Sequence, residues 1–167
     1  MFPYQLVIPS IALAALVLGG VVAIAARRVR DIRPWVVVAA LGVAAMPLAI
    51  ILHNVVSAWV GGDEGITFVI ALLVAPLCIA VGLVGTAAVL VRQRHALAVP
   101  VAIGAGGIAL FALYMGFLFV VTTAVGGNPD WQSYSDALVM TVATLAAIGG
   151  ALWSVVAIVR VGRPAAA

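Results

Sequence analysis

Lysine is missing from this 167-residue chain, and charged residues of all kinds make up only 8% of it. Without a lysine there is no amine for a Schiff-base cofactor, so a retinal protein is excluded. Soluble domains usually carry roughly a quarter charged residues and about half apolar ones. Here 66% of the residues are hydrophobic and the mean hydropathy is +1.34. The expected solvent of such a chain is therefore the lipid bilayer rather than water.

Cysteine occurs once, as Cys78, which excludes an intrachain disulfide and suits packing as a small hydrophobic side chain. The sequence also has no G-x-x-x-x-G-K-[ST], C-x-x-C, H-E-x-x-H or G-x-S-x-G motif. No acidic or basic residue is expected deep in a membrane span, where ion-coupled carriers usually keep one. These absences argue against an enzyme and against a proton-coupled transporter.

Five long apolar runs predict five transmembrane helices in a single all-α membrane domain. Each run exceeds the roughly 20 residues that cross a ~30 Å hydrocarbon core, whereas membrane β-strands would be about half as long. The loops between the runs are short, so no soluble domain is expected. Pro47 and Pro76 lie inside runs and are expected to bend their helices. The expected spans are 6–26, 34–60, 66–91, 97–125 and 137–161.

The arginines give this topology an orientation. All eight lie in the segments 27–33, 92–94 and 160–163, which fall at one end of a five-helix bundle. The acidic residues Asp63, Glu64, Asp130 and Asp136 fall at the other end. Short arginine-rich loops stay in the cytoplasm, so we expect the N-terminus outside and the C-terminus inside, in a multi-pass protein of a prokaryotic plasma membrane. This topology also accounts for the basic character of the chain, and no nucleic-acid partner is expected.

An imidazole and a carboxamide stand side by side near the end of the second run, in the stretch "LAIILHNVVSAWV". His53 shares a helix face with Ala45, Ala49 and Ser57, because these positions are four residues apart. It is therefore expected to face the bundle interior in the outer half of the membrane, where intramembrane polar groups find partners. The candidate intramembrane polar site consists of His53, Asn54, Ser57, Tyr114 and Asp136.

Three roles remain open for His53. A structural role, in which a neutral imidazole hydrogen-bonds a neighbour, needs the fewest assumptions. A proton or quinone-headgroup role would use the titration of imidazole near neutral pH. Haem or metal ligation is the third, although His95 lies at the arginine end and cannot form a bis-histidine pair with His53. No cofactor is predicted; haem and quinone remain alternatives at His53.

Small residues recur at four-residue spacing and predict close helix contacts, because lipid supplies no hydrophobic force between helices and packing matters more. The predicted packing positions are Ala15, Gly19 and Ala23 in the first run, Ala45 and Ala49 in the second, Cys78, Gly82 and Thr86 in the third, and Ala146, Gly150 and Ser154 in the fifth.

These features favour a small, non-catalytic accessory or structural subunit of a larger membrane complex, beside an energy-transducing or transport core. Its expected partners are the lipid bilayer and other membrane subunits, or further copies of itself. A homo-oligomeric channel or carrier is the first alternative, and a quinone- or haem-binding redox protein centred on His53 is the second.

Overall fold

The computed structural model describes residues 4–60, 74–125 and 132–162, and within these ranges the chain forms helices and the turns between them, with no strand. These ranges contain five long helices and one short 3₁₀ turn. Their bounds are α1 Tyr4–Ala25, η1 Arg30–Ile32, α2 Arg33–Val60, α4 Ala75–Arg92, α5 Ala98–Val125 and α6 Gln132–Gly162. The prediction of an all-α protein is confirmed.

Four of the helices contain segments long and apolar enough to cross a membrane, which supports the expected membrane protein. These segments are Leu6–Ala25, Ala75–Arg92, Ala98–Thr122 and Ser135–Val161. The fifth long helix, α2, has 28 residues. The orientation of the termini across a membrane stays a prediction.

The described bounds of two helices bear on the expected spans. α4 is described from Ala75. The preceding expected residues, 66–73, lie outside the described part of the chain, so the bend expected at Pro76 stays a prediction. α6 begins at Gln132, five residues before the expected start, so Asp136 lies in the second turn of the helix rather than at its beginning. Its carboxylate finds a partner there on α5, as described below.

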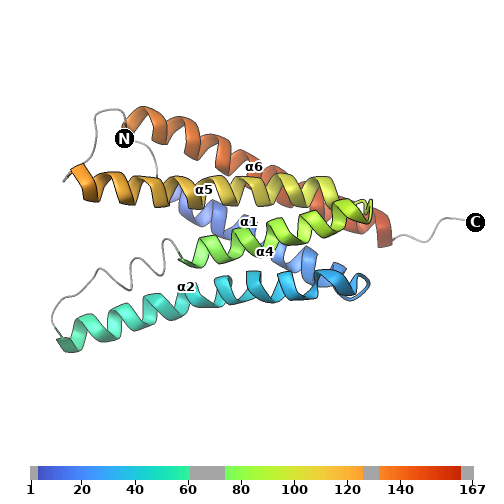
Figure 1. The fold of residues 1–167 in the computed structure, drawn as a ribbon, viewed down its shortest axis with the longest axis horizontal. Coiled ribbons are helices and arrows are strands. Elements are labelled where there is room, and N and C mark those ends of the chain that lie inside the picture. The colour runs from blue at the N-terminus through green and yellow to red at the C-terminus, as the bar shows by residue number, and fades with distance from the viewer. Residues whose placement is uncertain (1–3, 61–73, 126–131, 163–167) are drawn as a thin grey trace, which may run out of the picture.

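The helices run back and forth, and α6, α5, α4 and α2 follow one another across the molecule in Figure 1. α1 lies behind this row and contacts all four of the other long helices. The core lies where α1 meets the row, and its most completely buried large side chains include Leu18, Leu83, Ile108 and Met140. Because α1 packs mainly on α6 and only briefly on α2, the bundle is not equally tight on all sides.

The arginine-rich turns meet at one end of the bundle. The amide of Gln93, which follows α4, donates a hydrogen bond to a carboxylate oxygen of Asp31 in η1 at 2.8 Å. The Nε of Arg33 donates to the backbone carbonyl of Ala26 at 3.2 Å and so joins the first residue of α2 to the end of α1. Both polar links hold the turns together at the end of the molecule opposite Asp136.

Candidate functional site

Two residues of the predicted polar site, Tyr114 and Asp136, meet between α5 and α6. The Tyr114 hydroxyl donates to Oδ1 of Asp136 at 2.6 Å and lies 2.7 Å from the Ser135 hydroxyl. Both predicted residues are buried, with 8% of Tyr114 and 4% of Asp136 exposed. Since the tyrosine hydrogen is used on the carboxylate, the serine hydroxyl is the donor in the second bond. The three groups form a hydrogen-bonded cluster across two helices.

No arginine in the described ranges 4–60, 74–125 and 132–162 is placed to pair with Asp136. All eight lie in the segments 27–33, 92–94 and 160–163, and the nearest of these along α6 is Arg160. At ~1.5 Å per residue, 24 residues of helix separate the two by about 36 Å. Hydrogen bonding by Tyr114 is therefore the compensation that the structure provides for burying this carboxylate. The cluster clamps α5 to α6 at the end of the bundle opposite the arginines.

The other three predicted site residues, His53, Asn54 and Ser57, lie on α2, but their side chains fall outside the described residues. The helix itself adjoins α4, α1 and η1, and in the described part of the chain no contact joins it to α5 or α6. In Figure 1, α4 and α5 separate α2 from α6. The structure therefore divides the predicted site between two regions, and a role for His53 in proton, quinone or haem binding stays a prediction.

The packing positions on α4 and α6 lie at close contacts between helix backbones. A Cβ atom added at Gly82 would lie 2.6 Å from the Trp35 carbonyl oxygen on α2. One added at Gly150 would lie 2.5 Å from the Cα of Gly104 and 2.8 Å from the carbonyl oxygen of Pro100, both on α5. The hydroxyls of Thr86 and Ser154 are fully buried and donate to the carbonyls of Gly82 and Gly150, one turn earlier in their own helices. Cys78 and Ala146 are half-buried beside them.

The partner sides of these contacts carry glycines that the four-residue pattern missed. Gly107 of α5 lies against Ala143 of α6, because a Cβ at Gly107 would be 2.6 Å from the Ala143 carbonyl oxygen. Gly42 of α2 lies equally close to the backbone of Ala75 in α4. Glycines within long apolar runs were the available signal, although the sequence does not say which two of them face each other.

The predicted stripe on α1 does not meet another helix closely within this chain. Ala15 is buried, but Gly19 is half-buried and Ala23 is exposed. A Cβ added at Gly19 or Gly20 would find no neighbouring atom within 4 Å. The reason is that α1 turns the neighbouring face, with Leu18, toward Gly104 of α5. On α2, Ala45 is half-buried, and the side chain of Ala49 lies outside the described residues.

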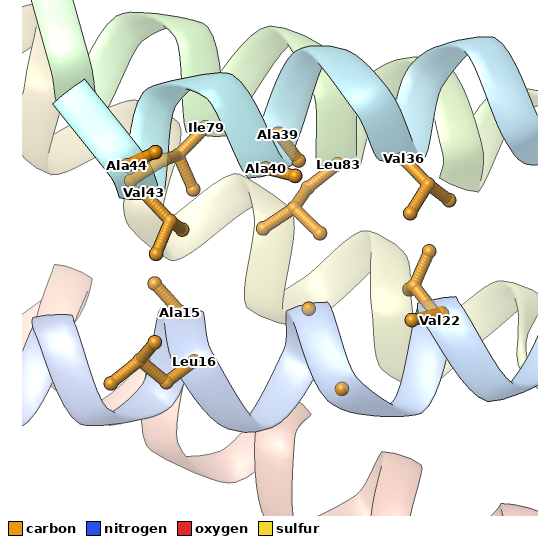
Figure 2. Close-up of a pocket in the computed structure, with 13 residues that line it drawn as sticks. Ala15, Leu16, Val22, Val36, Ala39, Ala40, Val43, Ala44, Ile79 and Leu83 are labelled. Atoms are coloured by element: carbon orange, nitrogen blue, oxygen red, sulfur yellow. The ribbon is translucent and has the colours of Figure 1, made fainter.

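The open side of α1 forms one wall of an apolar groove. Figure 2 shows Ala15, Leu16 and Val22 of α1 facing Val36, Ala40 and Val43 of α2 across an open space, with Ile79 and Leu83 of α4 behind it. The cavity measures about 460 Å³. A second cavity of about 250 Å³ shares Ala15, Leu16, Val43 and Ile79 with the first and continues along α1 to Ile8, over Ile108 and Phe111 of α5. Every side chain that lines either cavity is apolar.

The outer face of α6 carries a regular line of exposed apolar residues. Leucine occurs in α6 only at Leu138, Leu145 and Leu152, which are seven residues apart, and the exposed fractions of these side chains are 68%, 67% and 63%. Val142 and Gly149 lie between the leucines and Val156 follows Leu152, at alternating four- and three-residue spacing, and all three are exposed. We call these six residues the leucine seam. Its spacing is the heptad repeat by which two helices pack side by side.

Comparison with known proteins found no matching family model, no similar curated protein and no similar solved structure. The functional argument therefore rests on the residues of this chain.

Proposed function

We propose that this protein is a non-catalytic accessory subunit of a larger membrane assembly, and that it binds a transmembrane helix of its partner through the leucine seam of α6. We assign the arginine end of the bundle to the cytoplasmic side of a prokaryotic plasma membrane, because short arginine-rich turns remain in the cytoplasm. The partner is a membrane protein of an energy-transducing or transport assembly.

The spacing of the leucine seam carries this proposal. Exposure of apolar side chains is expected all over a protein in lipid and says little by itself. A seven-residue repeat is different, because fluid lipid chains require no period, whereas a neighbouring helix does. Leu138, Leu145 and Leu152 occupy one heptad position, and Val142, Gly149 and Val156 occupy the other. Helices in membranes commonly pack at the ~20° crossing angle that such a repeat favours.

The polar cluster supports a non-catalytic role. The hydroxyl of Tyr114 and the carboxylate of Asp136 are hydrogen-bonded to each other across α5 and α6. The cavities between α1 and α2 are lined by apolar side chains, which offer binding surface but no reacting group. Packing and binding are the activities for which these features are suited.

A matched pair of triple variants tests the seam. The first variant carries Leu138→Ala, Leu145→Ala and Leu152→Ala. The control carries Leu13→Ala, Leu41→Ala and Leu113→Ala, which remove the same groups from leucines on other helices that are 63%, 64% and 64% exposed. Each tagged protein is purified from its native membrane in mild detergent, and the proteins bound to it are quantified by mass spectrometry.

We expect the amount of partner membrane protein that co-purifies with the seam variant to be at least about tenfold lower than with the control. A tenfold difference corresponds to about 1.4 kcal/mol of binding free energy. Equal retention by both variants would show that the seam does not bind the partner. If the wild-type protein purifies only as a homo-oligomer and the seam variant as a monomer, the helix bound by the seam belongs to a second copy, and the accessory-subunit proposal is wrong.

A further inference from the structure

We propose that the groove between α1 and α2 binds one anionic phospholipid of the membrane, with an acyl chain lying along the groove and the phosphate held at Arg33. This proposal is independent of the leucine seam, which lies on α6. It rests on the volume of the groove, on its length and on the positive charge near the end of the groove at Arg33.

The groove has room for one apolar ligand. Its two adjoining cavities measure about 460 and 250 Å³ and together extend along α1 from Ala23 to Ile8. The volume of the groove falls in the range of roughly 300–1,000 Å³ that holds one such ligand. Its apolar lining suits a single hydrocarbon chain.

The length of the larger cavity matches one leaflet of a bilayer. The residues of α1 that line it run from Ala23 to Ala15. At ~1.5 Å per residue these eight steps cover about 12 Å, most of the ~15 Å that half of a ~30 Å hydrocarbon core provides. A chain that enters at the arginine end thus lies within the larger cavity, and the smaller cavity receives its terminal part.

Arg33 lies beyond the end of the groove that is nearest the arginine-rich turns. Two residues that line the groove lie close to the Arg33–Ala26 hydrogen bond along the chain. Val36 of α2 is three residues from Arg33, and Ala23 of α1 is three residues from Ala26. The guanidinium therefore lies one helical turn beyond both walls of the groove. Its planar set of five N–H donors matches the geometry of a phosphate, and the bond to the Ala26 carbonyl uses one of them. Arg27 and Arg30 are exposed on the same turn and add to the positive potential.

Charge also selects among lipids. Basic sites between transmembrane helices on the cytoplasmic side bind acidic headgroups, at about 1 kcal/mol for each arginine near the membrane surface. The α1–α2 turn has four arginines, Arg27, Arg28, Arg30 and Arg33, against one acidic residue, Asp31, which is hydrogen-bonded to Gln93. A phospholipid with a net negative headgroup is thus favoured over a zwitterionic one.

The groove can be filled without disturbing the packing of the bundle. Gly19 lines the larger cavity, and a Cβ there meets nothing within 4 Å, so the side chain of Gly19→Leu enters the groove. Gly106→Leu is the matched control, because Gly106 is equally open and lines neither cavity. For the headgroup, Arg33→Gln is compared with Arg160→Gln, which removes the same charge from the same end of the bundle.

The full-length protein and its four variants are placed in nanodiscs of equal parts phosphatidylglycerol and phosphatidylcholine, and the lipids retained on release are counted by native mass spectrometry. We expect one phosphatidylglycerol per wild-type chain. Gly19→Leu should reduce its retention at least about tenfold, with Gly106→Leu unchanged. Arg33→Gln should lower the preference for phosphatidylglycerol about fivefold, the factor for one arginine, whereas Arg160→Gln should leave it near the wild-type value.

Two results would overturn this proposal. Equal retention by Gly19→Leu and Gly106→Leu would mean that the retained lipid is only part of the surrounding annulus. Loss of a co-purifying protein from Gly19→Leu, with lipid retention unchanged, would mean that a partner helix covers the groove. A negative result with the leucine-seam variants would not bear on the lipid proposal, because those variants leave the groove intact.

Discussion

The pairs α5–α6 and α1–α2 each consist of consecutive antiparallel helices with small residues on the facing sides (Figure 1). One interface is closed, whereas the other is open and forms the apolar groove of Figure 2. Between α5 and α6, Gly150 lies on the backbone of Gly104, and Tyr114 is bonded to Asp136. Between α1 and α2, the glycine that corresponds to Gly150 is Gly19, and a methyl group added there would have no neighbouring atom within 4 Å. Small residues permit close approach, and the rest of the bundle decides whether it occurs.

The cause of the difference is the course of α1. It crosses behind the row of helices and packs on α6, so its contact with α2 is confined largely to the arginine end. In lipid an open interface is not filled by water, and it costs little if lipid chains occupy it. In a soluble protein the same groove would expose a large apolar area to water and would be disfavoured.

The largest expected effect in this comparison comes from Gly150→Ala. The added methyl group would meet the backbone of Gly104 and the carbonyl oxygen of Pro100, and backbone atoms cannot rotate away as a flexible side chain can. Overpacking typically costs about 1–3 kcal/mol, and this contact is expected at the upper end or beyond it. Thermal unfolding in mild detergent measures the loss. An unchanged unfolding midpoint would show that α5 and α6 are not in backbone contact at this level.

Several features of this comparison follow from the sequence, and others do not. The apolar runs predict helices, and two residues of the polar cluster on α5 and α6, Tyr114 and Asp136, were among the candidates, whereas the third, Ser135, was not. Their pairing was not predictable, because it depends on which helices become neighbours. Apolar periodicity normally supplies that information in a soluble protein, but lipid-facing and buried positions of membrane helices are both apolar. The same ambiguity put Gly19 and Gly150 in one class.

Helix neighbours also explain why the predicted polar site was divided. His53 and Asp136 were expected at a similar depth, and depth follows from counting residues along a helix. The lateral order of the helices does not follow from such counting, and α4 and α5 lie between the two. The leucine seam, by contrast, was readable: Leu138, Leu145 and Leu152 are the only leucines of α6, and their spacing is visible without a structure.

A smaller effect is expected from Tyr114→Phe, which tests whether the closed interface depends on its polar clamp. Removing the hydroxyl leaves Oδ1 of Asp136 without the donor that lies 2.6 Å away. An unsatisfied buried acceptor costs about 1–3 kcal/mol. The control is Thr141→Val, because the exposed Thr141 hydroxyl bonds only to the carbonyl of Ala137 in its own helix, and its loss should change stability by less than about 0.5 kcal/mol.

Unfolding of these variants in a graded detergent–SDS mixture measures both values. A double variant, Tyr114→Phe with Asp136→Leu, sharpens the result, because replacing both hydrogen-bonding partners by apolar groups should recover part of the loss. Equal losses in the single and double variants would show that the lost stability does not come from an unsatisfied Asp136 carboxylate. If Tyr114→Phe loses no stability, the tyrosine ring rather than its hydroxyl holds the helices together, and the clamp has no role in stability.

The smallest expected effect, and one of opposite sign, comes from Gly19→Ala. Glycine in the middle of a helix is less stable than alanine by roughly 0.5–1 kcal/mol, because more backbone freedom is lost on folding. At Gly150 the overpacking outweighs this gain, whereas at Gly19 the methyl group enters open space in the groove, so the gain remains. Gly106→Ala is the control and should be stabilised to the same extent, since it is equally open. The unfolding midpoint in detergent measures both.

A loss of stability at Gly19 alone would show that the groove is closed by a tightly packed group in the purified protein, and the contrast between the two helix pairs would then be wrong. A single methyl group is also too small to displace an acyl chain, so Gly19→Ala should retain the bound phospholipid that Gly19→Leu excludes.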